Sequence, residues 1–130
     1  MLEKLVPTGI MAPFNNAYSH GVVIPPNARV LQTAGQVGVA ADGTCPEDPS
    51  EQSELIWTNL TAILADADMG IEDIVKLTAF IVTDDVYPAY AAVRNRYLGD
   101  LKPPASTAIY VPKLIMPEWK IEVEAIAAKA

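Results

Sequence analysis

Cysteine and histidine are almost absent from this chain of 130 residues, which holds one of each. Because Cys45 is alone, no internal disulfide can form, and this fits a protein of the reducing cytoplasm. Because His20 is also alone and no ligand spacing recurs, we expect no metal site. The chain also lacks a GxGxxG pattern and a P-loop, so a nucleotide-phosphate site is not expected either.

Basic residues and long apolar runs are also scarce. Nine lysines and arginines against sixteen aspartates and glutamates give a formal charge of −7. An acidic chain without basic clusters repels phosphates, which disfavours nucleic-acid binding and RNA cleavage. No apolar run approaches the roughly 18 residues that indicate a transmembrane helix, and the N-terminus lacks the apolar core of a signal peptide. We therefore expect a cytoplasmic protein without a membrane partner.

What the chain does contain is ordinary for a globular protein. Hydrophobic residues make up 51% of it and charged residues 19%. At this length, the chain is large enough for one hydrophobic core and too small for two. We therefore expect a single domain over residues 1–130.

The first third of the chain reads as strands after an irregular lead-in over residues 1–16. A strand is predicted over 17–24, and the Pro25-Pro26-Asn27 turn ends it. Residues 29–35 read as its hairpin partner, and 36–40 continue that strand past a bulge.

Two helices follow, each with end signals. The first is predicted to begin near Ser50 as N-cap and to end at Gly70 as the C′ residue. The second opens at Asp84-Asp85, accepts Pro88 in its first turn and ends at Gly99. Their apolar residues recur at helical spacing and predict one buried stripe on each helix.

Three more strands are predicted, over 74–83, 106–111 and 120–128. Together with the helices they indicate an α+β domain in which both helices pack on one face of a mixed sheet. The other face would hold Tyr18, Thr33, Thr78 or Phe80, and Glu122, and only another chain could bury it. A homo-oligomer is therefore favoured over a monomer.

The last strand alternates with period two. Ile121, Val123, Ala125 and Ala127 share one face, and Glu122 and Glu124 share the other. The two carboxylates are either solvated, or they line a cleft in which burial would fit one of them for proton transfer.

Three segments of the sequence carry a family resemblance. They are Asn16-Ala17-Tyr18-Ser19-His20-Gly21, Leu31 to Gly38, and Pro104 to Val111 followed by Lys120 to Ala128. In this order and spacing they resemble the RidA (YjgF-like) family, and the resemblance spans nearly the whole chain.

The resemblance implies a chorismate-mutase-like fold that assembles as a homotrimeric barrel. The helices would lie outside, and clefts for a small-molecule ligand would lie between subunits. The best-known members are enamine/imine deaminases, which hydrolyse 2-aminoacrylate-type intermediates to 2-keto acids and ammonia and need no cofactor.

Site residues follow from the resemblance position by position. Tyr18 matches a family tyrosine, Gly35 a glycine whose backbone lies against the ligand, and Glu122 the cleft glutamate that positions or activates water. The deaminases have an arginine where this chain has Ser106, followed by Thr107. Their asparagine in the second helix aligns with Ala91, so both of these side chains are missing here.

Imine hydrolysis requires a carboxylate that orients and deprotonates water and a group that fixes the substrate. We assign Glu122 and Tyr18 as the candidate catalytic residues, and Gly35, Ser106 and Thr107 as candidate substrate-binding residues. The arginines at positions 29, 94 and 96 are candidates to replace the missing guanidinium, although Arg94 and Arg96 are expected on a solvated helix face.

Two functions from different classes remain open. The first is a hydrolase of small imines, enamines or related C=N compounds, whose substrate differs from 2-aminoacrylate because the arginine clamp is absent. The second is a non-catalytic trimeric module that binds a small metabolite or a protein partner in the same cleft.

Overall fold

A computed structural model describes all 130 residues of the protein as an α+β structure with two sheets. A small antiparallel sheet pairs β1 (Glu3–Leu5) with β2 (Gly21–Val23). The main sheet is mixed and has the order β3-β7-β5-β6, with β4 also paired to β7. Its strands are β3 (Arg29–Gln32), β4 (Gln36–Val37), β5 (Ile74–Ile81), β6 (Ala105–Tyr110) and β7 (Ile121–Lys129).

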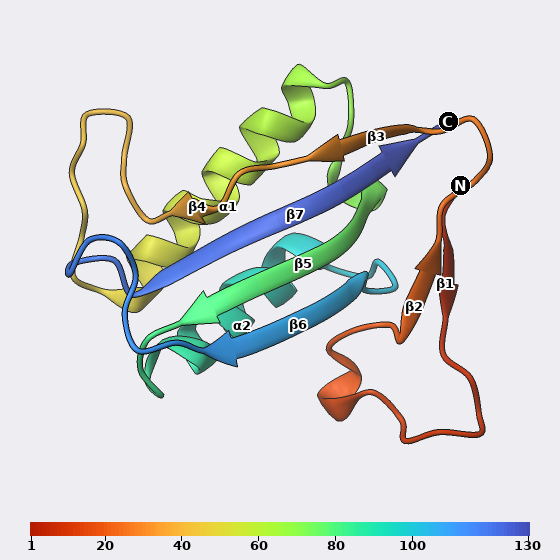
Figure 1. Cartoon of the computed structure of the whole chain (residues 1–130), viewed down its shortest axis with the longest axis horizontal. Helices are drawn as coiled ribbons and strands as arrows, with labels where there is room; N and C mark the ends of the chain where they lie inside the picture. Colours follow the sequence, from red (N-terminus) through yellow and green to blue (C-terminus); the bar gives the residue numbers. More distant parts are fainter.

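Both α-helices cover the same face of the main sheet, as Figure 1 shows. They are α1 (Pro49–Asp66) and α2 (Val86–Leu98), and α2 connects β5 to the parallel strand β6. The predicted arrangement of two helices on one face of a mixed sheet is therefore confirmed. The predicted central strand is also confirmed, because β5 lies between β7 and β6.

The alternation predicted for the last strand determines which face forms the core. Ile121, Val123, Ala125 and Ala127 are each at most 4% exposed and belong to one apolar cluster with the helices. The same face of β5 contributes Leu77, which pairs with Ala125. Glu122 and Glu124 consequently point to the face of the sheet that neither helix covers.

The ends of α1 differ from the prediction by two residues. Asp48, not Ser50, is the N-cap, and its carboxylate accepts a hydrogen bond from the Ser50 amide at 3.1 Å. The helix ends at Asp66 with Ala67 as its C-cap, and Asp68 then adopts φ +58°, so Asp68 takes the left-handed position predicted for Gly70. Aspartate tolerates this region better than most residues, which is why no glycine is required there.

The predicted hairpin in the N-terminal third is wrong. β2 pairs with β1, a strand missed within the lead-in, whereas β3 pairs with β7. The turn after Pro25-Pro26 places Asn27 at φ +65° and sends the chain from the small sheet to the main one. Short-range turn signals could not show that the partner of β3 lies far along the chain, where Arg29 pairs with Lys129 and Gln32 with Ile126.

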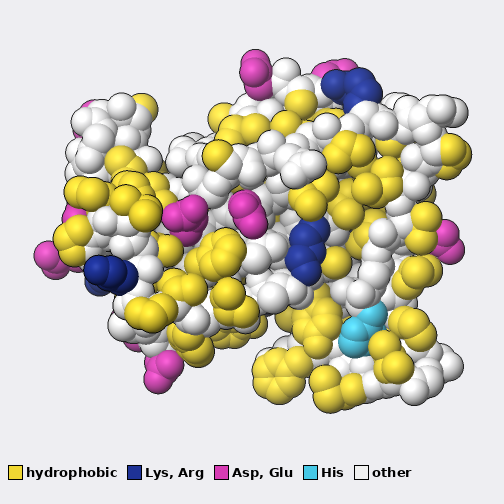
Figure 2. Space-filling model, viewed as in Figure 1, with side chains coloured by type: hydrophobic (Ala, Val, Ile, Leu, Met, Phe, Trp, Pro, Cys, Tyr) yellow, Lys and Arg dark blue, Asp and Glu magenta, His cyan; other side chains and the backbone are white.

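The sheet face away from the helices is open to solvent in the single chain, and Figure 2 shows hydrophobic side chains on this side interspersed with a few charged ones. Val30 and Ile109 are 52% and 45% exposed. Tyr18, which we predicted on this face, instead lines a pocket together with Arg94 of α2 and Ser106 of β6. Neither helix of the structure is both long and apolar enough to span a membrane.

Candidate functional site

Gly35 and Glu122 form the first part of the candidate site. Gly35 lies between β3 and β4, two strands that both pair with β7, and Glu122 pairs with Val37 across that edge. A Cβ atom at Gly35 would overlap the Glu122 carboxylate. Only glycine leaves room for that carboxylate, which is half-buried and makes no hydrogen bond or ion pair within the chain.

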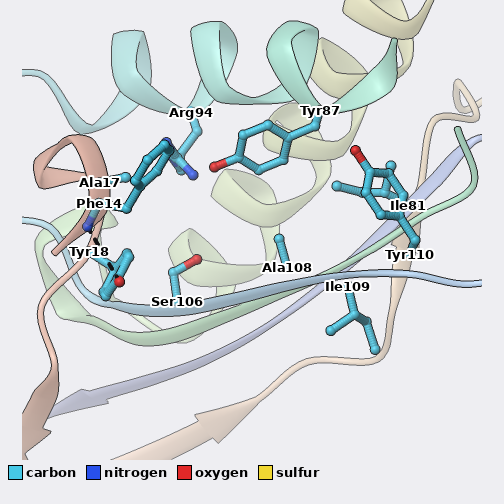
Figure 3. Close-up of a pocket in the computed structure, with 10 residues that line it drawn as sticks. All are labelled: Phe14, Ala17, Tyr18, Ile81, Tyr87, Arg94, Ser106, Ala108, Ile109 and Tyr110. Atoms are coloured by element: carbon cyan, nitrogen blue, oxygen red, sulfur yellow. Dashed lines mark hydrogen bonds between the residues drawn. The ribbon is translucent and has the colours of Figure 1, made fainter. Parts of the chain in front are cut away.

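A pocket of about 350 Å³ forms the second part. It lies between α2 and the edge strand β6, and the segment around Phe14 closes one end (Figure 3). The figure shows Arg94 and Tyr87 on the α2 side of the pocket, opposite Ser106 and Ala108 on β6. Most of the lining is apolar or aromatic, and Arg94 and Ser106 are the exceptions. The full lining consists of Phe14, Ala17, Tyr18, Ile81, Tyr87, Arg94, Ser106, Ala108, Ile109 and Tyr110.

Ser19 holds Tyr18 beside Ser106. Its buried hydroxyl donates to the Pro103 carbonyl at 2.7 Å, and its amide donates to the Pro104 carbonyl at 3.0 Å. These two bonds attach the segment before β2 to the start of β6. The Tyr18 hydroxyl accepts a 3.4 Å hydrogen bond from the Phe14 amide, and its ring meets the His20 ring edge-on.

Ser106 and Thr107 project to opposite faces of β6, as neighbouring strand residues must. Ser106 lines the pocket on the helix side. The Thr107 hydroxyl is on the open face and accepts a 2.7 Å hydrogen bond from the Lys76 ammonium. A single chain therefore brings Tyr18 together with Ser106 and brings Gly35 together with Glu122, and it leaves Thr107 outside the pocket.

The prediction that Arg94 lies on a solvated helix face is wrong. Arg94 is 3% exposed and lies on the pocket wall, with its guanidinium 5.6 Å from the centre of the Tyr90 ring. The spacing of four residues from the buried Tyr90 was the sequence signal, because residues i and i+4 share one helix face. Arg96 is exposed as predicted and pairs with Glu54.

The third candidate arginine, Arg29, also lies outside the pocket. Its guanidinium donates to the Ala67 carbonyl at 2.7 Å and so attaches β3 to the end of α1. Of the three arginines considered, only Arg94 can meet a ligand in this pocket.

Gln52 supports the Glu122 half of the site and was missed in the sequence. Its side chain is fully buried, donates to the carbonyls of Pro46 and Glu118, and accepts from the Lys120 amide. Gly38 allows this packing, because a Cβ atom there would overlap the Gln52 backbone. Gln52 thereby fixes the entry into β7, two residues before Glu122.

Cys45 lies next to this network and is not activated. Burial, followed by the Glu118 carboxylate, raises the pKa of its thiol, so the thiolate is disfavoured. No group of three or more His, Cys, Asp or Glu side chains is arranged to hold a metal ion.

Comparison with known proteins adds evidence from outside the chain. Residues 10–129 match the family model described as Endoribonuclease L-PSP. TdcF of Escherichia coli, named as a proposed reactive intermediate deaminase, is 29% identical over 132 residues and 99% of each chain. The RutC family protein UK114 of Drosophila melanogaster is 30% identical over 130 residues, which cover 98% of this chain and 90% of that protein.

Solved structures share the fold over the same length. YyfB of Yersinia pestis, a Rid family protein of unknown function, has a TM-score of 0.87 at 27% identity over 98% of both chains. Escherichia coli TdcF with bound serine has a TM-score of 0.73 at 24% identity over 98% of this chain and 100% of that one, which shows the fold alone. The chain is therefore a member of the YjgF/RutC/Rid family, as the sequence motifs predicted.

Proposed function

We propose that this protein hydrolyses the C=N bond of small reactive imines, including those formed from enamines by tautomerisation. Water adds to the electrophilic carbon of the imine and forms a carbinolamine. The carbon–nitrogen bond of that intermediate then breaks, and the nitrogen leaves as ammonia while the carbon becomes a carbonyl. No redox step or cofactor is required, because water supplies the carbonyl oxygen and the two protons that convert the imine nitrogen to ammonia.

The Glu122 carboxylate in the space left by Gly35 is the observation that carries this proposal. A half-buried carboxylate without a partner in the chain is free to accept a hydrogen bond from water. In our proposal Glu122 orients that water and takes its proton during the addition. The relationship to TdcF supports the same class of reaction.

Tyr18 and Ser106 would act on the substrate from the other half of the site. The Tyr18 hydroxyl would donate to the leaving nitrogen, and Ser106 would donate to a polar group of the substrate. Because these residues and Glu122 lie on different faces of one sheet, a complete site requires a second copy of the chain. Thr107, on the open face, would contribute from that side.

We further propose that the assembly is the homotrimeric barrel expected from the resemblance. The uncovered sheet face and its exposed apolar residues, Val30 and Ile109, support an interface between copies. Light scattering should give the mass of three chains, and a stable monomer would contradict the shared site.

The reaction can be tested with imines produced in place by an amino-acid oxidase. Semicarbazide traps an imine as a semicarbazone, so an active protein lowers semicarbazone formation. Glu122→Gln should reduce this effect about 100-fold, the size of a general-base contribution. Glu124→Gln, on the same face but exposed, is the matched control and should keep the full effect. If no imine is hydrolysed faster with the protein present, the deaminase proposal is wrong.

A non-catalytic binding module is the second candidate. It is favoured by Ser106, which stands where the deaminases that this chain resembles have an arginine. An intact trimer that binds a ligand but accelerates no imine hydrolysis would support this alternative. The charge of −7 disfavours RNA as the substrate, despite the description of the family model.

A further inference from the structure

A buried arginine without an acidic partner lies on the pocket wall. The Arg94 guanidinium makes two hydrogen bonds, from Nε and Nη2, and both end on Asn95 Oδ1 at 3.2 Å. The one ion pair in the chain joins Arg96 to Glu54, so no carboxylate lies within 4.0 Å of Arg94. Nη1 therefore donates to no acceptor in the protein.

This arrangement leaves the charge of Arg94 poorly compensated. An arginine side chain stays charged in proteins, and a buried charge without a counter-ion is costly. The Tyr90 ring and the Asn95 amide are neutral groups, so they offset only part of that cost. An anion that enters the pocket would supply the missing charge and accept from the free N–H groups.

The rest of the pocket selects for an apolar body. Its walls include the rings of Phe14, Tyr18, Tyr87 and Tyr110, and Arg94 is the one charged side chain in the lining. A cavity of about 350 Å³ is much larger than a three-carbon acid requires. Aromatic walls around such a space favour a flat or branched hydrophobic group.

We propose that this pocket binds a carboxylate that bears a bulky apolar or aromatic group, with Arg94 holding the carboxylate. The inference rests on the proposed function, in which this pocket is one half of the site. It narrows the substrates to 2-imino acids with large apolar side chains. Arg94 thus supplies from α2 a guanidinium that Ser106, on the opposite wall, does not provide.

Binding of stable product analogues tests the inference without any chemistry. Phenylpyruvate carries both the ring and the carboxylate, phenylacetone replaces the carboxylate by a methyl group, and pyruvate lacks the ring. Calorimetric titration of the wild-type protein should show phenylpyruvate binding at least about tenfold more tightly than either relative, as expected for a charge-assisted pair.

Substitutions then assign the effect to Arg94. Arg94→Met keeps the hydrocarbon bulk and should weaken phenylpyruvate binding roughly 10- to 100-fold, with little effect on phenylacetone. Arg96→Met, on the exposed face of the same helix, should change neither affinity. Equal affinities of the wild-type protein for phenylpyruvate and phenylacetone would overturn the inference, and so would an unchanged affinity in Arg94→Met.

A second pair of variants keeps the test decisive if Arg94→Met does not fold. Ser106→Glu places a carboxylate inside the pocket, where it would compete with the ligand for Arg94. Ser106→Gln has the same size without the charge. Phenylpyruvate should bind at least about fivefold more weakly to the Glu variant than to the Gln variant, and equal affinities would overturn the inference. Hydrolysis of small imines without selective phenylpyruvate binding would refute the inference and leave the proposed function standing.

Discussion

Replacing Gln52 by methionine tests how the Glu122 half of the site is held. The change removes three hydrogen bonds between the buried amide and backbone groups: Nε2 to Pro46 O at 2.8 Å, Nε2 to Glu118 O at 3.0 Å, and Lys120 N to Oε1 at 3.0 Å. It also removes the longer contact from Nε2 to Cys45 Sγ at 3.6 Å. Methionine has a similar volume, so no large cavity forms in the core. The effect therefore reports the lost polar contacts.

The magnitude follows from the surroundings of the three backbone groups. Pro46 and Lys120 are half-buried and Glu118 is exposed, so water can reach part of this region. At about 1 kcal/mol for each net hydrogen bond, the free energy of unfolding should fall by about 3 kcal/mol. For a chain of this size the thermal midpoint should fall by roughly 10 °C.

Urea unfolding followed by circular dichroism measures this loss. Wild type and variant must be compared at one protomer concentration, because assembly shifts the apparent stability. Gln36→Met is the matched control, since its amide makes one local bond to Ala34 O at 3.2 Å, and it should stay within about 0.5 kcal/mol of wild type. A Gln52→Met protein as stable as that control would refute the role assigned to this network.

Three further predictions concern the site and its assembly. Gly35→Ala should abolish most imine hydrolysis while the chain still folds, because the new methyl group would displace the Glu122 carboxylate. Full activity in the semicarbazide assay would contradict the role assigned to the contact between Gly35 and Glu122. Refolding Glu122→Gln together with Tyr18→Phe in equal amounts should restore about a quarter of wild-type activity if neighbouring copies share each site of a trimer, because about a quarter of the sites then hold both native residues. Activity no higher than that of the single variants would argue against sharing. The Cys45 thiol should react with a disulfide reagent at pH 8 more slowly than free cysteine, and its reaction rate should rise only at higher pH, because its raised pKa means that the thiolate forms at higher pH. A rate equal to that of free cysteine would contradict this prediction.

Much of the fold could be predicted from local patterns. The period of two over 121–127 predicted both the strand and its buried face, and Ile121 and Val123 are fully buried as expected. The helical spacing of Ile56, Leu60 and Leu64 likewise predicted the buried stripe of α1. These patterns are reliable because a side chain's direction along a strand or helix depends on that element alone.

Pairings between distant segments could not be predicted in this way. The prolines before Asn27 indicated a turn, but not that β2 would join β1 while β3 joined β7. The burial of Gln52 and Arg94 was missed for a related reason. Polar side chains are expected at the surface unless a partner is known, and the partners of Gln52 lie up to 68 residues away in the chain.

The sequence by itself determined the family, the order of the helices and of the strands after β1, and the presence of Glu122, Gly35, Tyr18 and Ser106. Only the tertiary structure decided that these residues form two separate groups, because register across the sheet determines which face each side chain reaches. It also decided that Arg94 enters the pocket, because the packing of α2 over β6 turns that helix face inward.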